Sequence, residues 1–243
     1  MKHFAIIGKP VGHSVSGEWF NSYFAKAGID ADFVMIEPDL AQRRDFRAWI
    51  RRSEFSGLLV TIPYKMEVMA FLNEADEHAR AIGAANIISI TNGVLKGFNT
   101  DHSGFESELI RLRPHGVKKA VVLGIGGAAS AVLYAMKRNK IESVRVSRNK
   151  EKGDYSYDDL PDQILAEADL IVNCSPLGMG DFADSFPPIN YSVLNKNALA
   201  FDLIYNPAET VFLNKCAEAG CQTENGRGMV EFVYKRALEL WGM

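Results

Sequence analysis

Short apolar runs alternate with longer amphipathic stretches along almost the whole of this chain. Continuous runs rich in Val, Ile and Leu are typical of strands covered on both faces, so these runs predict buried parallel strands. They are Phe4–Ile7, Phe33–Ile36, Leu58–Thr61, Ala120–Leu123, Val144–Ser147, Leu170–Asn173 and Leu199–Asp202. The stretches between them predict helices that include Asp39–Arg51, Gly127–Arg138 and Glu209–Ala219. Strands that alternate with helices predict an α/β protein with right-handed crossovers.

Two places in this pattern predict a boundary between lobes. The first follows a predicted hairpin, in which Asn86–Ile90 and Val94–Phe98 flank a Thr-Asn-Gly turn. A helix is predicted from about Ser103, because Ser103 and Glu106 have the spacing of a capping box. The predicted structure therefore changes from a hairpin to a helix close to residue 101.

The second place is the Gly226-Arg227-Gly228 turn, which precedes a final helix at about Met229–Leu240. A chain that leaves its first lobe and returns to it with the last helix forms two lobes around a cleft, where ligands commonly bind. The predicted division is residues 1–101 plus 227–243 for one domain and residues 102–226 for the other.

Composition narrows the classes of protein that this chain can represent. Its 243 residues are 47% hydrophobic and 23% charged, which excludes collagen-like, disordered and disulfide-scaffold proteins. The net charge of −3 gives no field for binding nucleic acid or anionic membranes. No apolar run approaches the ~18 residues of a membrane span, and the first strand breaks too early for a signal peptide, so we expect a cytoplasmic protein.

The cysteines and a cluster of arginines are both expected to have structural rather than catalytic roles. The cysteines are odd in number and lack CxxC spacing, so we expect small buried hydrophobes rather than disulfides or a zinc site: Cys174, Cys216 and Cys221. Five arginines at helical spacing predict a solvated helix face: Arg43, Arg44, Arg47, Arg51 and Arg52. His13 and His102 stand beside polar segments discussed below and could contact a substrate, but no ligand cluster predicts a metal.

The segment from Val121 to Leu133 predicts a dinucleotide site, because it reads strand, then G-x-G-x-x-A, then helix. Gly124 permits the tight turn, and Gly126 lets the backbone approach a pyrophosphate. Ala129 allows close packing of helix and strand. The start of the helix, with the turn residues Ile125, Gly127 and Ala128, then offers unpaired amides to the phosphates.

The next predicted strand indicates which nucleotide binds. An NAD site usually places an acid about 20 residues after the glycines, to accept from the ribose 2′-hydroxyl. Here the strand runs into Ser147, Arg148, Asn149 and Lys150. A guanidinium pairs well with a 2′-phosphate, so the sequence predicts NADP(H).

Three further segments carry polar residues where predicted strands end: GHSVS at 12–16, VTIPYK at 60–65 and KGFNTD at 96–101. Together with five other motifs they resemble the shikimate dehydrogenase family, and the resemblance covers nearly the whole chain. The other five, in order, are GAANIIS, VLGIGGAASAVL, VNCSPLGMG, FDLIYNPAET and an NGRGM…LW tail. The family implies an NADP-dependent enzyme that interconverts 3-dehydroshikimate and shikimate. It also implies a substrate-binding catalytic lobe and a Rossmann-like NADP-binding lobe.

The resemblance assigns roles residue by residue. Ser14 and Ser16 match hydroxyls that bind the substrate carboxylate. Groups around the ring hydroxyls and the reacting C3 oxygen are matched by Thr61, Lys65, Asn86 and Asp101. A substrate-side tyrosine is matched by Tyr205, positions beside the nicotinamide by Leu203 and Gly226, and the 2′-phosphate loop by residues 147–152.

Elementary chemistry is consistent with these roles. Hydride reduction of a ketone leaves an alkoxide that must gain a proton, and the reverse reaction must remove one. A lysine close to an aspartate can stabilise the oxyanion and relay that proton. Lys65 is therefore the predicted general acid/base, and Asp101 the residue that orients it and could bind a ring hydroxyl.

The chain departs from the family pattern at several positions, which leaves substrate identity open. Gly17 replaces a proline, Phe20-Asn21 replaces a His-Asn pair, and His102 replaces a glycine. Val233 stands where the family places a glutamine toward the substrate. One alternative is a paralogue that acts on quinate or another cyclic hydroxy acid. Another is a catalytically idle NADP-binding regulatory protein, against which the presence of both Lys65 and Asp101 argues. The sequence allows a monomer or a homodimer.

Overall fold

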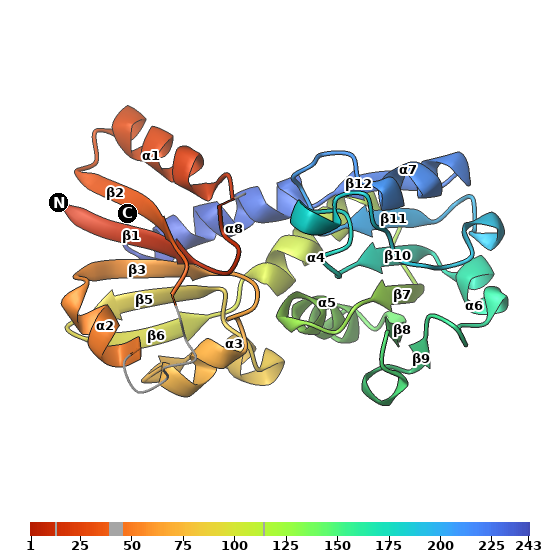
Figure 1. Cartoon of the computed structure of the whole chain (residues 1–243), viewed down its shortest axis with the longest axis horizontal. Helices are drawn as coiled ribbons and strands as arrows, with labels where there is room; N and C mark the ends of the chain where they lie inside the picture. The colour runs from red at the N-terminus through yellow and green to blue at the C-terminus, as the bar shows by residue number, and fades with distance from the viewer. Residues whose placement is uncertain (13, 39–45, 114) are drawn as a thin grey trace. The chain divides into compact units, whose positions relative to one another are not determined.

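The computed structural model describes residues 1–12, 14–38, 46–113 and 115–243. The chain forms two compact units (Figure 1). Unit 1 comprises Met1–Thr100 and Phe232–Met243, and unit 2 comprises Asp101–Glu231. Each unit is built on a six-stranded sheet with helices, so the predicted α/β class is confirmed.

The sheet of unit 1 has the order β2-β1-β3-β5-β6-β4. Its strands are β1 (Lys2–Ile7), β2 (Ala31–Ile36), β3 (Phe55–Val60), β4 (Glu74–Ala75), β5 (Ile87–Thr91) and β6 (Val94–Phe98). Strand β1 runs parallel to β2 and β3, whereas β5 is antiparallel to both β3 and β6. The helices are α1 (Ser16–Ala27), α2 (Phe46–Arg52), α3 (Glu77–Ile82) and the 3-10 helix η1 (Glu67–Phe71).

One predicted strand of unit 1 is not buried. Strand β2 lies at the edge of the sheet, and the side chains of Val34 and Met35 are 40% and 45% exposed. The edge is partly closed by Asn21 of α1, whose side-chain amide donates to the Phe33 carbonyl and accepts from the Phe33 amide, both over 2.9 Å. Phe20, next to Asn21, stacks on the Phe33 ring with centroids 4.5 Å apart.

The end of the chain is part of the core of unit 1. The Trp241 ring stacks on Phe4 with centroids 4.5 Å apart, and its Nε1 donates to the Ile88 carbonyl over 3.0 Å. A Cβ atom at Gly57 of β3 would stand 2.2 Å from Trp241 Nε1, so this position has no room for any side chain. The last helix, α8 (Arg227–Leu240), thus returns to the first sheet, as predicted.

The sheet of unit 2 is entirely parallel, with the order β12-β11-β10-β7-β8-β9. Its strands are β7 (Lys119–Leu123), β8 (Glu142–Ser147), β9 (Tyr155–Ser156), β10 (Leu170–Asn173), β11 (Leu199–Asp202) and β12 (Gln222–Asn225). The helices are α4 (Asp101–Leu112), α5 (Gly127–Arg138), α6 (Asp162–Glu167) and α7 (Val211–Glu218). Short 3-10 helices lie at Lys150–Lys152, Gly180–Phe182 and Tyr191–Val193.

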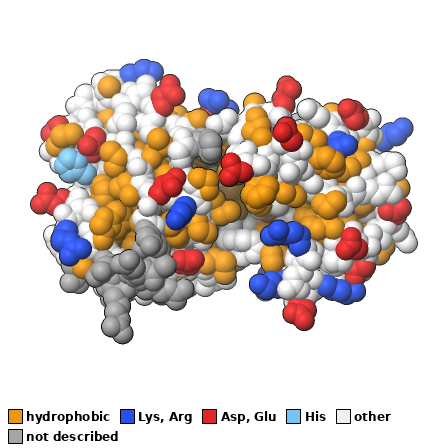
Figure 2. Space-filling view, in the orientation of Figure 1, with side chains coloured by type: hydrophobic (Ala, Val, Ile, Leu, Met, Phe, Trp, Pro, Cys, Tyr) orange, Lys and Arg blue, Asp and Glu red, His pale blue; other side chains and the backbone are white. Residues whose placement is uncertain are grey.

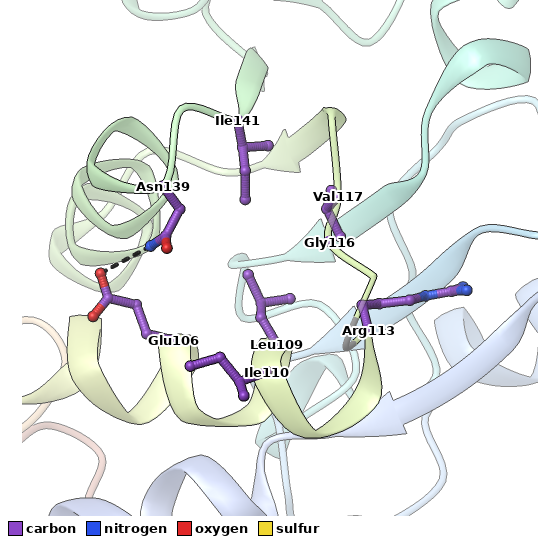
Figure 3. A pocket seen from close by; sticks show the side chains of 8 residues that line it. All are labelled: Glu106, Leu109, Ile110, Arg113, Gly116, Val117, Asn139 and Ile141. Carbon is purple, nitrogen blue, oxygen red and sulfur yellow. Dashed lines mark hydrogen bonds between the residues drawn. The ribbon is translucent and has the colours of Figure 1, made fainter.

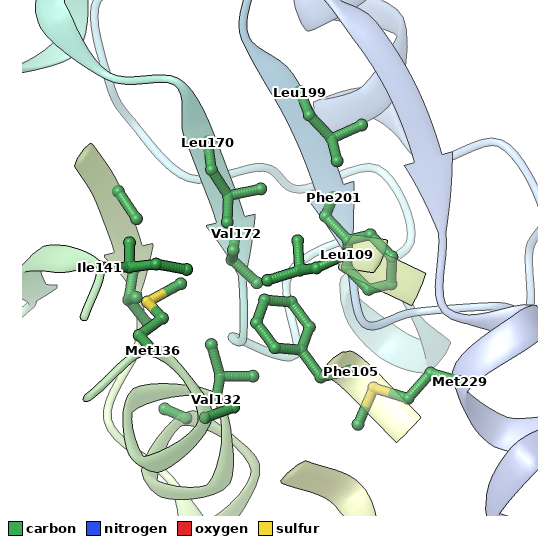
Figure 4. Close-up of a cluster of buried hydrophobic side chains, with 14 residues drawn as sticks. Phe105, Leu109, Val132, Met136, Ile141, Leu170, Val172, Leu199, Phe201 and Met229 are labelled. Carbon is green, nitrogen blue, oxygen red and sulfur yellow. The ribbon is translucent and has the colours of Figure 1, made fainter. Parts of the chain in front are cut away.

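Apolar side chains fill both faces of this parallel sheet. On one face, α4 and α5 pack on β7, β10 and β11 (Figure 4). The rings of Phe105 and Phe201 meet there edge to face, with centroids 5.5 Å apart. On the other face, α6 and α7 contribute Leu165, Phe212 and Cys216 to a second cluster. Burial on both faces explains why the central strands β7, β10 and β11 are largely apolar.

Two predicted helix starts are wrong. Helix α4 begins at Asp101, so Ser103 lies in its first turn and does not form the predicted capping box. The Asn86 side chain accepts the Thr100 amide over 2.8 Å and so fixes the residue before the helix. Helix α8 begins at Arg227, whose amide donates to the Asn225 side chain over 3.0 Å.

The predicted turn before the last helix is therefore also corrected, because Gly228 lies within α8. A Cβ atom at Gly228 would stand 2.4 Å from a carboxylate oxygen of Glu108 on α4, and Glu108 is held by Arg111 over 2.5 Å. Glycine is required there by close packing, not by a turn.

The predicted helix at Asp39–Arg51 corresponds to α2, and residues 39–45 lie outside the described part of the chain. Arg43 and Arg44, and the side chains of Arg47 and Arg51, are likewise outside it, so the predicted basic face is not described. None of the helices that the structure describes has the length and apolar character to cross a membrane. Acidic and basic side chains are interspersed on the face drawn in Figure 2.

Candidate functional site

The topology of unit 1 brings the predicted substrate residues to one edge of its sheet. Strands β1, β3 and β6 end at this edge, and β5, which runs the other way, begins there. The segments that carry Ser14, Thr61 and Lys65 follow the ends of β1 and β3, and Asn86 immediately precedes β5. Asp101, the first residue of α4 and of unit 2, stands three residues after the end of β6. Segments separated by up to 72 residues in the sequence therefore meet at the rim of unit 1.

Backbone hydrogen bonds close this rim beyond the strands. The Thr61 amide donates to the Ile7 carbonyl over 2.9 Å, and the Val60 amide to the Asn86 carbonyl over 2.8 Å. The Asn86 amide donates to the Phe98 carbonyl over 3.0 Å. The backbone at Thr61 and Asn86 is thus fixed before any ligand binds.

Ser14 and Ser16 form a hydroxyl pair. Their Oγ atoms lie 2.7 Å apart, and the Ser16 amide donates to Ser14 Oγ over 3.3 Å. Ser16 is fully buried at the start of α1, whereas Ser14 is half-buried. Two hydroxyls and a helix start together suit a carboxylate, which accepts hydrogen bonds only.

The Asn86 side chain connects the two segments that carry the predicted catalytic pair. Its Oδ1 accepts from the Thr100 amide over 2.8 Å, and Thr100 directly precedes Asp101. The amide of Ala85, next to Asn86, donates to the Lys65 carbonyl over 2.8 Å. Asn86 and Asp101 are 2% and 4% exposed, so both are desolvated polar groups, and Lys65 is half-buried.

In unit 2 the glycine turn lies at the switch point of the sheet, where β7 neighbours β10 and β8 follows on the other side. Gly124 has φ +113°, and a Cβ there would stand 3.1 Å from the Cys174 carbonyl carbon and the Ser175 amide. Gly126 has no neighbour within 4 Å of a built Cβ, and it caps α5 with no side-chain hydrogen bond. Crevices of this kind at the carboxyl ends of parallel strands bind dinucleotides.

The loop after β8 carries the predicted 2′-phosphate residues. Ser147 Oγ donates to the Asn149 carbonyl over 2.7 Å and accepts from the Asn149 amide over 3.0 Å. Arg148 is exposed. Lys150 pairs with Asp159, and this ion pair holds the pKa of the Asp159 carboxyl down at about 2. The structure therefore leaves Arg148 and Asn149 exposed, while Ser147 is buried and Lys150 is paired with Asp159.

The predicted nicotinamide residues lie together at the ends of β11 and β12. A Cβ at Gly226 would stand 2.2 Å from the Leu203 carbonyl oxygen, and the Gly226 amide donates to the Ile204 carbonyl over 3.1 Å. Tyr205, predicted on the substrate side, is in this same loop of unit 2. It is half-buried and is not part of the rim of unit 1.

The sequence analysis missed a buried polar network behind this loop. Asp202, Asn173 and Thr210 are at most 1% exposed and hydrogen-bond to one another. A signal was available, since Asp202 and Asn173 both end predicted strands of the same sheet. Thr100, which fixes Asn86, was also missed.

The histidines and cysteines singled out in the sequence either pack against other side chains or lie outside the described residues. His102 is 5% exposed, and its ring meets that of Tyr134 edge to face with centroids 5.4 Å apart. His13 lies outside the described residues. Cys216 and Cys221 are buried and reduced, as predicted, while Cys174 is half-buried. Over the described ranges, no group of three or more His, Cys, Asp or Glu side chains is placed to hold a metal.

A separate surface groove of about 200 Å³ lies on unit 2 (Figure 3). Residues from α4, from the end of α5 and from the approaches to β7 and β8 line it: Glu106, Leu109, Ile110, Arg113, Gly116, Val117, Asn139 and Ile141. It lies at the amino ends of β7 and β8, whereas the glycine turn lies at their carboxyl ends. None of its residues belongs to the predicted site.

Comparison with known proteins assigns the family. Residues 6–88 match the model of the shikimate dehydrogenase substrate binding domain. The chain is 34% identical to a shikimate dehydrogenase (NADP(+)) of Carboxydothermus hydrogenoformans, over 97% of this chain and 90% of that protein. It is 30% identical to the enzyme of the same name from Methanococcus aeolicus, over 99% and 91%. The chain belongs to the shikimate dehydrogenase family.

Solved structures of shikimate dehydrogenases agree in fold. The enzyme from Thermus thermophilus in complex with NADP(H) and shikimate superposes with a TM-score of 0.88 at 28% identity, over 100% of this chain and 94% of that one. The enzyme from Listeria monocytogenes in complex with shikimate and NAD gives a TM-score of 0.83 at 26% identity, over 100% and 92%. The resemblance inferred from the motifs is thus confirmed at the level of the family.

Proposed function

We propose that this protein is an NADP-dependent shikimate dehydrogenase, which interconverts 3-dehydroshikimate and shikimate by hydride transfer. The observation that supports the proposal is the edge of the unit 1 sheet, where the segments that carry the Ser14–Ser16 hydroxyl pair, Lys65 and Asn86 lie, with Asn86 bonded to the residue before Asp101. A small cyclic acid with several hydroxyls needs such a set of donors and acceptors. Family membership supports the same substrate.

Substrate binding begins at the carboxylate. The Ser14 and Ser16 hydroxyls, 2.7 Å apart, each give a hydrogen to one carboxylate oxygen in place of their mutual bond. Thr61, Asn86 and Asp101 bind the ring hydroxyls, and the family resemblance assigns Tyr205 a role toward the substrate. Asn86 and Asp101 are buried, so hydrogen bonds that they make to the substrate form in a desolvated site.

Lys65 is the general acid/base. In reduction its ammonium group gives a proton to the oxygen at C3 as the carbonyl becomes an alcohol, and in oxidation the neutral amine takes that proton back. Asp101 holds and orients the amine through a charge-assisted hydrogen bond. A positive group beside the forming alkoxide also stabilises its charge.

Unit 2 holds the cofactor. Gly124, Ile125, Gly126, Gly127 and Ala128 surround the pyrophosphate, and the open Cβ position at Gly126 with the uncapped start of α5 fits this group. The loop from Ser147 to Lys150 would hold the 2′-phosphate, and Leu203 and Gly226 would hold the nicotinamide. When bound, the reduced nicotinamide supplies the hydride that the carbonyl carbon accepts.

The test is the initial rate of NADP+ reduction with shikimate and with quinate, repeated with NAD+. We expect turnover of shikimate with NADP+ at a higher kcat/KM than with NAD+. Turnover of quinate alone selects the paralogue, to which Val233 points because a buried valine offers no hydrogen bond. Binding of NADPH without oxidation of either acid overturns the enzyme assignment and favours a regulatory protein.

The same preparation tests assembly. We propose that the enzyme works in the cytoplasm as a monomer or homodimer. A sedimentation mass of about 27 or 54 kDa, one or two times the 26.9 kDa chain, supports this assembly, and a larger mass contradicts it.

A further inference from the structure

Asn173 and Asp202 end two neighbouring strands of unit 2. They face each other in the parallel register of β10 and β11, and both are fully buried. Burying a carboxylate is unfavourable unless hydrogen bonds replace the lost water. Asp202 has no part in the mechanism above, so its place at the cofactor edge of the sheet calls for an explanation.

Both Asp202 oxygens are engaged. Oδ1 accepts from Asn173 Nδ2 over 3.1 Å and from the Ile204 amide over 3.0 Å. Oδ2 accepts from Thr210 Oγ1 over 2.7 Å. These three donors are neutral, and burial raises the pKa of the carboxyl to about 6. Asp202 thus ties both ends of the loop from Leu203 to Thr210 to the end of its own strand.

Asn173 does the same for the neighbouring loop. Its Oδ1 accepts from the Ser175 amide over 3.0 Å and from Ser175 Oγ over 2.7 Å. Its Nδ2 also donates to the Leu177 carbonyl over 3.1 Å, and its carbonyl accepts the Leu203 amide over 3.0 Å. The Asn173–Asp202 pair therefore joins two loops that the sequence separates by 25 residues or more.

Both loops meet the elements that hold the cofactor. Ser175 and Cys174 lie against Gly124, leaving 3.1 Å to a Cβ built there. Leu203 lies against Gly226, where a built Cβ would stand 2.2 Å from the Leu203 carbonyl oxygen. A shift of either loop moves a wall of the dinucleotide crevice, and both loops depend on the same carboxylate.

We propose that Asp202 is a positioning residue for hydride transfer: through Asn173 and Ile204 its carboxylate holds the two loops that set the nicotinamide half of the cofactor. The proposal rests on the proposed function and adds a residue to it. It predicts a defect confined to the nicotinamide end, because the adenosine end is held by the separate loop after β8. Displacement of a reacting group by about 1 Å lowers a rate by on the order of 10²-fold.

The test compares Asp202→Ala, Asp202→Asn and the wild-type enzyme. We expect D202A to lower kcat about 10–100-fold and to weaken NADPH binding, with the Kd for adenosine 2′,5′-bisphosphate unchanged within about two-fold. D202N should recover most of kcat, because its amide oxygen still accepts from Asn173 and Ile204 while its NH2 donates to the Thr210 hydroxyl. Thr210→Val removes one of the three bonds to Asp202 and also the hydroxyl that caps α7 at the Leu213 amide, so it should give an intermediate loss of kcat together with a lower Tm.

Leu165→Ala is the matched control. Leu165 is 1% exposed on α6 in the same unit, and truncating it opens a cavity that lowers Tm without removing a polar contact. We expect L165A to keep kcat within about two-fold. The proposal is overturned if D202A and L165A lower kcat equally, or if D202A weakens adenosine 2′,5′-bisphosphate as much as NADPH. Absence of shikimate turnover by the wild type refutes the proposed function instead, and the two binding measurements still test Asp202.

Discussion

The hydroxyl oxygens of Ser14 and Ser16 lie 2.7 Å apart, one on the loop after β1 and the other at the buried start of α1. Helix α1 is fixed on β2 by the two hydrogen bonds between Asn21 and Phe33, so the pair is held by the fold rather than by a ligand. A preformed pair binds a carboxylate without first having to be ordered.

Removing one of these hydroxyls should weaken substrate binding. Ser16→Ala deletes a donor to the carboxylate, which is worth about 1.5–3 kcal/mol for a charged partner, so KM for shikimate should rise about 10–100-fold. KM for NADP+ should stay within two-fold. The measurement is steady-state kinetics with each substrate varied in turn. An equal rise in both KM values would show a folding defect in place of lost recognition.

Replacement of Lys65 should abolish the proton transfer while leaving the shikimate contacts of other residues in place. Lys65→Ala is expected to lower kcat by about 10²–10⁴, with a smaller change in KM. The control is Lys96→Ala on β6, whose side chain is 45% exposed and pairs with Glu74 at 3.7 Å. Near-normal kcat in K65A would remove Lys65 from the mechanism.

Arg148 and Lys150, both in the loop after β8, should contribute unequally to the choice of cofactor. Arg148 is exposed, whereas Lys150 is paired with Asp159. Arg148→Ala should raise KM for NADP+ about 10-fold or more through loss of a charge-assisted bond and leave KM for NAD+ unchanged. Lys150→Ala should change either KM less than three-fold. Equal kcat/KM for NADP+ and NAD+ in the wild type would contradict the predicted preference.

Substitutions of the two glycines in the turn after β7 should affect different properties: Gly124→Ala the stability of the fold, and Gly126→Ala the binding of the cofactor. Gly124 has φ +113° and backbone neighbours 3.1 Å from a built Cβ, so Gly124→Ala should destabilise the fold by about 1–3 kcal/mol. Gly126 has φ −79° and open space, so Gly126→Ala should change stability by less than about 0.5 kcal/mol.

The order of the two substitutions should be reversed for cofactor affinity, where Gly126→Ala should have the larger effect. The Cβ of G126A enters the space through which the backbone approaches the pyrophosphate, so the Kd for NADPH should rise about 10-fold or more. Thermal unfolding and fluorescence titration of NADPH measure the two effects on the same samples. Full NADPH affinity in G126A would move the pyrophosphate away from this turn.

Asp202 should make stability depend on pH. Burial raises its pKa to about 6 from an ordinary 3.8, so the folded state binds the proton more tightly than the unfolded state. Its favourable contribution is complete below about pH 4 and is lost as pH rises through 6, a change of about 3 kcal/mol. Asp202→Asn has no such ionisation. In urea titrations the free energy of unfolding of D202N, relative to that of the wild type, should therefore rise between pH 4 and 7. A difference that stays constant over this range would contradict the raised pKa.

The apolar pattern by itself predicted the strands β7, β8, β10 and β11 and the helix α5 of unit 2, but not β9 or β12. Leu170–Asn173, Leu199–Asp202 and Gly127–Arg138 have the same bounds in the structure as in the prediction. A parallel sheet covered on both faces requires continuous apolar runs, and that requirement is local in the sequence. The glycine turn and the eight ordered motifs were also sufficient to identify the family.

Tertiary structure decided the features that depend on contacts between residues far apart in the sequence. Thr100, which precedes α4, is held by the Asn86 side chain, and Gly228 of α8 packs closely against the Glu108 carboxylate of α4. Strand β2 became an edge, and Asp202 became a buried partner of Asn173, through pairings that no sequence window contains. Hydrogen bonds and close contacts between residues far apart along the chain form only once the sheets bring them together.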